Sequence, residues 1–390
     1  MAITETPMVK YYDAESNPTQ NGDGGEIPVI IGISGNATPA SGIQKFKKYS
    51  ECNATVANGG LGTSTTDNPL LAFLKDFFEE NEKINSDDRS VPYVYVIDLG
   101  TLTTNTTEGA NPETTLTVTP WTTAMELAKI KREVTAEVFV GLPKTYINDS
   151  IGIMQSAAES IKADSVYGNP RIAYFTIDGC TDTELKALTG TGEHKIQKTR
   201  VGLIEPLKFG KHVANILNTP ATEEPGYSTF RTIEPGIFTE RTKTEEDDLQ
   251  NAGIIFGRDE RAGPYIYPKI CLGVSTSFSA VPDARPNDTL LHYRRNVDQL
   301  IRESYVLIYE QLKRNETETN FEYLQEDLNL LVADKIRDGV MKTGTYIELV
   351  EDEVDPYDLQ VQGVGIPVNS TLKIGFSFYI EKPKIISGGE

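Results

Sequence analysis

The residues that could do chemistry in this chain of 390 residues are few and widely spaced. A serine hydrolase needs a serine beside a histidine that a carboxylate orients, and the histidines are His194, His212 and His292. Neither Ser34 nor Ser275 stands in the Gly-x-Ser-x-Gly frame that exposes a nucleophilic serine. We therefore predict no catalytic residue and no enzyme activity.

Phosphate and metal sites are not indicated either. Two groups of glycines lack the strand, helix and lysine of a phosphate-binding loop: Gly59, Gly60 and Gly62, and Gly190 and Gly192. The acidic residues from Glu351 to Asp358 lack the central glycine of a calcium loop, and Pro356 interrupts them. The cysteines form no close pair, so we expect small buried residues at Cys52, Cys180 and Cys271. We predict no metal and no cofactor.

The overall charge excludes some partners. The formal net charge is −20, and a nucleic acid backbone attracts clustered lysine and arginine instead. The sequence has no apolar run of the roughly 20 residues that span a bilayer, and its first residues lack the pattern of a secretion signal. We predict no nucleic acid partner, no membrane insertion and folding in the cytoplasm where the chain is made.

The first two thirds of the chain alternate between strand and helix patterns. Residues 1–26 are polar and predict an N-terminal arm with a short strand at Val9 and Tyr11. Within residues 27–285 we expect strands over 27–32, 93–99, 137–142 and 171–177, and helices beginning near Pro69, Thr123 and Ile147. We interpret residues 219–248 as a loop that leads into a solvated run of charges. The alternation predicts an α/β domain with a parallel sheet covered by helices.

Residues 286–382 predict an α+β domain. A first helix carries an apolar stripe at three-and-four spacing, made by Val297, Leu300, Ile301, Ser304, Ile308 and Leu312. A second helix, with a capping box at Thr319 and Glu322 and a stop at Gly339, carries Leu324, Leu328, Leu331, Val332 and Ile336. Residues 371–381 then alternate strictly as a terminal strand, with one face formed by Leu372, Ile374, Phe376, Phe378 and Ile380. Residues 383–390 predict a C-terminal arm whose strand includes Lys384, Ile385 and Ile386.

In this order the elements resemble the sheath protein of contractile phage tails and of related contractile injection systems. The segments that carry the resemblance are Pro28–Gly32, Leu71–Phe78 with Tyr93–Ile97, Leu249–Ile254, and Tyr293–Arg295 at the start of the first long helix. Two features depart from the family's pattern. Residues 274–276 lack its usual arginine, and the chain stops at Glu390, soon after its last strand.

The resemblance implies a structural protein. Its expected fold is a subtilisin-like α/β domain without protease activity, an α+β domain close to an inner tube, and arms that add strands to neighbouring subunits. The expected partners are further copies in a helical homopolymer of stacked hexameric rings, the inner tail tube protein, the baseplate and the tail terminator. The expected location is the tail of a virion or of an injection particle, assembled in the host cytoplasm.

Two further hypotheses concern particular residues. We predict that Arg294, Arg295 and Arg302 help to face an acidic tube surface; the alternative is that they pair with carboxylates of the chain itself. The competing function is an α/β enzyme or small-molecule binder with an added oligomerisation domain. Because such sheets place ligands beyond the strand ends, its ligand would lie near Asp98, Gly141 or Asp178.

Overall fold

The computed structural model describes most of the chain, and the following account concerns these residues alone: 26–84, 91–107, 114–165, 169–189, 195–196, 200–219, 225, 228–262, 265–271, 291–311, 318–351 and 359–367. We call the described residues up to 271 the α/β unit and those from 291 onward the C-terminal unit. The arm strands with Val9, Tyr11, Lys384, Ile385 and Ile386, and the terminal strand 371–381, lie outside the described residues. The division at residue 286 remains a prediction.

An eight-stranded sheet forms the centre of the α/β unit, in the order β10-β9-β8-β7-β6-β1-β3-β2. Neighbouring strands from β9 to β3 run parallel, and the two outermost strands, β10 and β2, run antiparallel to their neighbours. The strands are β1 Ile27–Gly32, β2 Gln44–Phe46, β3 Val94–Asp98, β6 Val134–Val140, β7 Ile172–Phe175, β8 Val201–Ile204, β9 Ile254–Ala262 and β10 Tyr265–Cys271. This arrangement confirms the predicted parallel sheet covered by helices.

Helices cover both faces of this sheet, because its central strands carry apolar side chains on both sides. On one face lie α1 Tyr49–Cys52, α2 Pro69–Ile84 and α6 Phe209–Asn218. On the other face lie α3 Thr119–Ala128, α4 Ile147–Ser165, α5 Asp182–Ala187 and α7 Lys243–Asn251. The helices α2 and α6 approach so closely that a Cβ atom on Gly210 would lie 2.4 Å from the backbone oxygen of Phe73.

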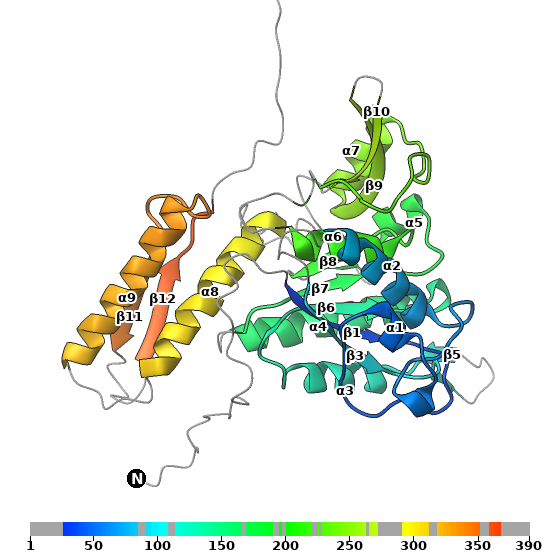
Figure 1. Ribbon diagram of the computed structural model, residues 1–390, viewed down its shortest axis with the longest axis horizontal. Coiled ribbons are helices and arrows are strands. Elements are labelled where there is room, and N and C mark those ends of the chain that lie inside the picture. The colour runs from blue at the N-terminus through cyan, green and yellow to red at the C-terminus, as the bar shows by residue number, and fades with distance from the viewer. Residues whose placement is uncertain are drawn as a thin grey trace, which may run out of the picture.

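Smaller elements complete the α/β unit. A hairpin of β4 Thr104–Thr106 and β5 Thr114–Leu116 occupies a threonine-rich segment. Short 3-10 helices span Val56–Asn58 and Lys144–Tyr146. The long hairpin of β9 and β10 projects from one end of the sheet beside α7 (Figure 1).

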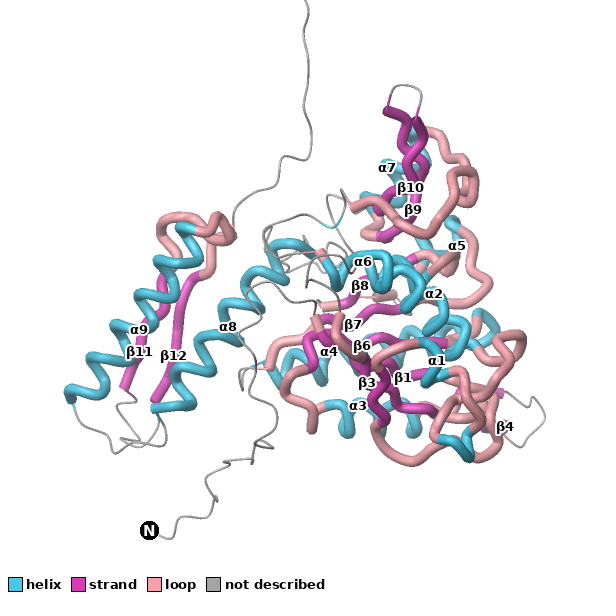
Figure 2. The backbone as a smooth tube through the Cα atoms, in the orientation of Figure 1, coloured by secondary structure: helices cyan, strands magenta, loops and turns pink. Residues whose placement is uncertain are grey.

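The C-terminal unit consists of two long helices against a two-stranded sheet (Figure 2). The helices are α8 Leu291–Gln311 and α9 Glu318–Arg337, and the antiparallel strands are β11 Tyr346–Glu351 and β12 Leu359–Val364. The helices and β11 share a core of Leu300, Leu324, Leu328, Val332, Val340, Met341, Ile347 and Leu349. The second predicted stripe faces this core, as do Val297, Leu300 and Ile308 of the first, whereas Leu312 lies outside the described residues. Gly339 takes the left-handed conformation, φ +74°, that ends a helix.

Two predicted details of these elements are wrong. The helix predicted to begin near Thr123 begins at Thr119, because Pro120 occupies its first turn, where a missing N–H costs nothing. In α9, Thr319 lies inside the first turn instead of capping it, because the helix already begins at Glu318. The run of charges from Glu245 to Asp248 is exposed or partly exposed, as predicted, and it is helical, since Thr242 and Glu245 form a capping box that starts α7.

Candidate assembly surfaces and strand-end cluster

The first half of α8 is attached to the α/β unit by buried ion pairs. The Nη1 atom of Arg200 lies 2.8 Å from Oδ2 of Asp298, and Nε of Arg294 donates to Oδ1 of the same carboxylate over 2.8 Å. Burial alone would raise the pKa of Asp298, but the guanidinium groups of Arg200 and Arg294 outweigh that effect and hold it below its usual range. One carboxylate thus serves two cations at the boundary of the two units.

The same helix is tied to the root of the N-terminal segment. The Nε atom of Arg295 lies 3.1 Å from Oε1 of Glu26, and its Nη2 donates to the backbone oxygen of Thr219 over 2.6 Å. About two turns further along, Nη1 of Arg302 donates to the backbone oxygen of Pro170 over 3.0 Å. Because Leu291 belongs to the core of the α/β unit and Leu300 to that of the C-terminal unit, α8 packs into both.

These contacts bear on the predicted tube-facing arginines. Pairing within the chain, the alternative given above, is observed for Arg294 with Asp298 and for Arg295 with Glu26. Arg295 is only 3% exposed, so the prediction that it faces a tube is not supported in this conformation. Arg294 and Arg302 are partly exposed, and for them the prediction stands untested.

The two-stranded sheet of the C-terminal unit has one covered face and one open face. Ile347 and Leu349 are buried beneath the helices, whereas Tyr346 and its cross-strand partner Val364 are 49% and 44% exposed. Within the part of the chain that the structure describes, no third strand pairs with β11 or β12. Strand edges of this kind offer unpaired N–H and C=O groups to an extended segment.

The residues named for the competing function lie along the carboxyl ends of the parallel strands. Asp98 ends β3, Gly141 follows β6, and Asp178 follows β7, where its N–H donates to the backbone oxygen of Leu142 over 2.9 Å. Of the three, only Asp98 lines the groove of about 570 Å³ at this end of the sheet.

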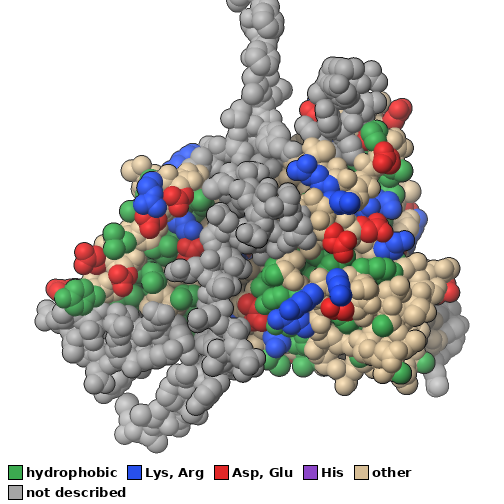
Figure 3. Space-filling model, in the orientation of Figure 1, with side chains coloured by type: hydrophobic (Ala, Val, Ile, Leu, Met, Phe, Trp, Pro, Cys, Tyr) green, Lys and Arg blue, Asp and Glu red, His purple; other side chains and the backbone are tan. Residues whose placement is uncertain are grey.

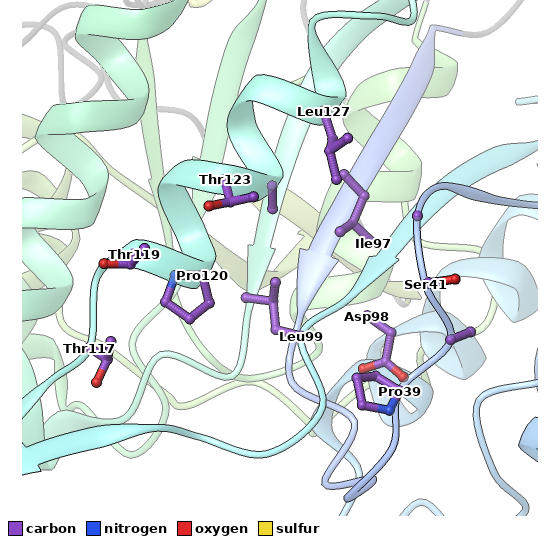
Figure 4. A pocket seen from close by; sticks show the side chains of 13 residues that line it. Pro39, Ser41, Ile97, Asp98, Leu99, Thr117, Thr119, Pro120, Thr123 and Leu127 are labelled. Carbon is purple, nitrogen blue, oxygen red and sulfur yellow. The ribbon is translucent and has the colours of Figure 1, made fainter.

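The groove is open and mostly apolar (Figure 4). Besides Asp98 its walls come from the 39–42 loop, from β3 and the residue after it, and from α3, including Pro39, Ile97, Leu99, Pro120 and Leu127. The Oδ1 atom of Asp98 accepts the N–H of Gly100 over 2.8 Å. Its Oδ2 atom and the hydroxyl of Thr117 find no hydrogen-bond partner among the described residues. Neither a histidine nor a cysteine is among the described residues that line this groove.

His212 is the histidine whose side chain the structure describes, and it belongs to a buried structural cluster. Its ring packs against Phe230 and Phe238, its Nδ1 lies 3.0 Å from the backbone oxygen of Lys208, and its Nε2 lies 3.5 Å from Oε1 of Glu205. Burial lowers the pKa of His212 to about 4 against the pull of the Lys208 oxygen, and the charge of Arg241 adds to the lowering. Since the ring is wholly covered, it is not placed to take a proton from a substrate.

Glu205 joins the cluster to the projecting hairpin. Its Oε1 accepts the N–H of Gly257 over 2.6 Å, and its Oε2 lies 2.7 Å from Nη2 of Arg241. Arg241 also reaches Asp182 at the start of α5, with Nε 2.7 Å from Oδ2. Burial raises the pKa of Glu205 to about 7, although Arg241 opposes it. The cluster thus connects β8, α5 and β9.

The opposite shifts of these two pKa values predict an effect of Glu205→Gln on acid stability. His212 takes a proton in the unfolded chain near pH 6.5 but in the folded chain only near 4, so it lowers stability as the pH falls through that window. Glu205 keeps a proton in the folded chain up to about pH 7 and loses it near 4.5 when unfolded, so its contribution is lost as the pH rises. Between about pH 4.5 and 6.5 the stability lost through His212 and the stability gained through Glu205 on acidification cancel in the parent protein.

Glu205→Gln removes the titration of residue 205, so the loss of stability caused by protonation of His212 in the unfolded chain is no longer compensated. We expect the unfolding free energy of the variant to fall about 1.4 kcal/mol per pH unit more steeply than that of the parent between pH 6.5 and 5. Urea unfolding at pH 5, 6 and 7 measures this slope, with the exposed Glu240→Gln as control. Parallel profiles for the variant and the parent would refute this assignment of protons.

The remaining sequence expectations concern cysteines, metals and membranes. Cys52 and Cys180 are free and buried, as predicted, whereas the side chain of Cys271 lies outside the described set. Among the described residues, no group of histidine, cysteine and carboxylate side chains is arranged to hold a metal ion. None of the described helices combines the length and the apolar character needed to cross a bilayer. In Figure 3 acidic and basic side chains lie interspersed over the described surface.

The fold is shared with contractile sheath proteins. No protein-family model and no curated protein matches the sequence. The helical sheath of the anti-feeding prophage in its contracted state matches with a TM-score of 0.62 and 12% identity, over 97% of this chain and all of that one. The contracted sheath complex of the extracellular contractile injection system PVC matches at 0.59 and 11%, over 98% and 99%. The sheath tail protein of Desulfitobacterium hafniense matches at 0.56 and 10%, over 92% and 100%.

These matches run over nearly the whole length of both chains, so they include the α/β unit and the C-terminal unit together. The described chain therefore has the fold of a contractile sheath protein, a mixed α/β fold with a sheet rich in parallel strands. The resemblance seen in the order of the sequence elements is confirmed at the level of the fold. The matched proteins are sheaths of tails and injection particles, and they do not favour the enzyme or ligand-binding alternative.

Proposed function

We propose that this protein is the subunit of a contractile sheath, a structural protein without enzyme activity. The observation that carries the proposal is the match over 97% of this chain and the full length of the anti-feeding prophage sheath protein. The subunit polymerises as a helix of stacked hexameric rings around an inner tail tube, between a baseplate and a tail terminator. Its α/β unit corresponds to a subtilisin-like domain, and it works in the tail of a virion or injection particle that assembles in the host cytoplasm.

The junction at α8 supports a rigid-body mechanism. Buried ion pairs and two apolar cores hold the units to one helix, so a subunit with these contacts moves as one body when its neighbours repack. Contraction is then a switch between two lattices of the same subunit, which needs no nucleotide. A gain of about 3 kcal/mol per subunit, an ordinary coupling energy, summed over many subunits would drive the tube through an envelope.

The two arms connect the subunits in this proposal. Residues 1–26 and 383–390 add strands to the sheets of neighbouring copies through Val9 and Tyr11 and through Lys384, Ile385 and Ile386. Such contacts are heterologous, and a heterologous contact whose rotation does not close builds a helical filament. The partly exposed Arg294 and Arg302 are the residues that we retain as candidates for a tube-facing surface.

Assembly of the purified full-length protein tests the proposal. We expect electron micrographs to show long striated cylinders, formed alone or on added inner tube protein. The double variant Val9→Ser, Tyr11→Ser is expected to abolish the cylinders while the melting temperature of the free subunit stays unchanged, because in this proposal the strand pairs only with a neighbouring copy. Lys10→Ser, on the other face of the same short strand, is the control and assembles normally. A parent protein that stays monomeric under all these conditions would overturn the proposed function.

A further inference from the structure

The loop that precedes α7 holds one apolar side chain out to solvent. Ile237 is 45% exposed, whereas the next residue, Phe238, is buried and packs against the ring of His212. The loop is also fixed on the other side of Ile237, because the N–H of Gly236 donates to Oδ2 of Asp259 in β9 over 2.6 Å. Ile237 is thus an exposed apolar residue on a loop that is anchored on both sides.

Acidic side chains surround Ile237. Glu234 and Glu240 belong to the same loop and are exposed, and neither forms an ion pair with another described residue. Asp259, which holds the loop, is exposed as well. An apolar centre with a charged rim is the composition of many protein contact sites. The surface that fits this loop is an apolar hollow with basic residues at its rim.

A surface of this kind lies at the opposite end of the eight-stranded sheet. Alternate residues of a strand point to the same side, so Tyr93, Tyr95, Ile97 and Leu99 follow one face of β3. Ile97 and Leu99 line the apolar groove beside α3, which Figure 4 shows. The groove and the two tyrosines therefore lie side by side along the same strand.

Two lysines lie over these tyrosines. The Nζ atom of Lys45 is 3.5 Å from the ring centroid of Tyr93, and that of Lys131 is 5.1 Å from the ring centroid of Tyr95. Neither lysine forms an ion pair with a described carboxylate, although the net charge of the chain is −20. Lys45 is exposed and Lys131 partly exposed. The rings hold both cations in place beside the groove, where a carboxylate from another molecule can reach them.

The groove also contains polar atoms that lack a partner. Oδ2 of Asp98 and the hydroxyl of Thr117 form no hydrogen bond with a described residue, and Asp98 is only 6% exposed. A buried polar atom without a partner is costly, so an occupant that brings a donor relieves this cost. Thr239, two residues beyond Ile237, is exposed and carries a hydroxyl.

We propose that the loop 234–240 of one copy docks in this groove of a second copy, with Ile237 in the apolar part and the two glutamates of the loop at Lys45 and Lys131. The inference rests on the proposed function, which requires contacts between subunits. The apolar side chain supplies most of the affinity, because exposed ion pairs contribute little. The charges fix the orientation of the loop and exclude other partners.

The two surfaces cannot meet within one copy. The loop lies beside β9 and α7 at one end of the sheet, and the groove lies beside β3 and α3 at the other end (Figure 1). A contact between two different surfaces is heterologous, so each copy binds one neighbour through its loop and another through its groove. Repetition of such a contact builds a closed ring or an open helix.

Cysteine cross-linking in the full-length protein tests the contact. Ser41 is exposed and lines the groove, so the double variant Ser41→Cys, Thr239→Cys places one thiol on each surface and keeps Ile237. After mild oxidation of assembled cylinders, we expect a ladder of covalent dimers, trimers and larger multimers in a non-reducing gel. Each single variant, and the pair Ser41→Cys, Leu207→Cys, is the control and is expected to remain monomeric in the gel. Regular cylinders of the double variant without a ladder would overturn the inference.

Exchange of the charges tests the pairing. The variant Lys45→Glu, Lys131→Glu is expected to need a roughly tenfold higher concentration for assembly, because the glutamates of the loop then meet like charges. Adding Glu234→Lys and Glu240→Lys is expected to restore assembly at the parent concentration.

A matched control for this exchange is Lys75→Glu, Lys83→Glu, which makes the same change in net charge on exposed residues of α2. It is expected to assemble like the parent. Assembly of Lys45→Glu, Lys131→Glu at the parent concentration would overturn the inference, and so would a fourfold variant that folds but does not recover.

The outcomes separate this inference from the proposed function. Regular parent cylinders together with no ladder and no effect of charge exchange would overturn the inference while the sheath function stands. Failure of the parent protein to assemble would instead overturn the sheath function.

Discussion

Asp298→Ala is expected to cost about 3–5 kcal/mol of unfolding free energy, because it leaves buried guanidinium groups without their carboxylate. Arg200 is 5% exposed and Asp298 1%, so water cannot replace the lost partner. The loss falls on the attachment of α8 to the α/β unit. We therefore expect the C-terminal unit to unfold in a separate, earlier transition. Urea unfolding followed by circular dichroism and by tyrosine fluorescence measures the change in unfolding free energy. It also shows whether the transitions seen by the two probes still coincide.

The comparison with Arg200→Met makes this prediction sharper. Asp298→Ala removes the shared partner of two cations, Arg200 and Arg294. In Arg200→Met, by contrast, Asp298 still pairs with Arg294. We thus expect Asp298→Ala to cost more than Arg200→Met. Asp334→Ala, which removes an exposed pair with Arg337 in α9, is the control and should cost less than about 1 kcal/mol. Equal costs for Asp298→Ala and this control would contradict the role of the junction.

Local patterns were enough to predict most of the α/β unit. The strand Ile27–Gly32 and the helix from Pro69 follow from a run of apolar residues and from a capping signal, which act over a few residues. The parallel order of the strands follows from the alternation of strand and helix. The stripes of α8 and α9 were equally legible, because their burial repeats with the period of the helix.

The contacts that join the units could not be predicted in this way. Arg295 meets Glu26 across 269 residues, and Arg200 meets Asp298 across 98, so no local spacing announces either pair. An arginine on a polar helix face carries the same local signal whether it meets solvent or a buried carboxylate. Gln325 is similar, since its side-chain amide bonds the backbone of Ile347 and Leu349, in a hairpin that begins more than twenty residues later. The predicted tube-facing set included Arg295 for this reason.

Glu80 shows the same limit in α2. It lies three residues after Phe77, on the apolar face of the helix, and it is 0% exposed although it carries a charge. Its Oε1 accepts the backbone N–H of Arg231 over 2.5 Å, and its Oε2 accepts the N–H and the hydroxyl of Thr232 over 3.0 and 2.5 Å. These partners lie about 150 residues away, and the sequence has no signal of them.

Glu80→Ala is therefore expected to destabilise the protein by about 3–5 kcal/mol, since it leaves several buried donors unpaired. Glu80→Gln is also expected to destabilise the protein. The groups around Glu80 are hydrogen-bond donors, and the NH₂ group of glutamine cannot accept a hydrogen bond from them. The neighbouring Glu79→Ala is the matched control: its side chain is 43% exposed, and among the described residues it pairs with the exposed Lys75 over 3.9 Å and with Lys211 over 3.3 Å.

The Glu80 contacts hold a loop whose apolar residues complete a core. Phe230 and Ile233, on either side of the bonded residues, are 3% and 7% exposed and pack with α2 and α6. Loss of the carboxylate should release this loop before the sheet unfolds, so proteolysis between residues 228 and 233 is expected to speed up in Glu80→Ala. Denaturant unfolding together with limited proteolysis measures both effects. A Glu80→Ala protein as stable and as resistant as Glu79→Ala would show that burial of Phe230 and Ile233 holds the loop without the carboxylate.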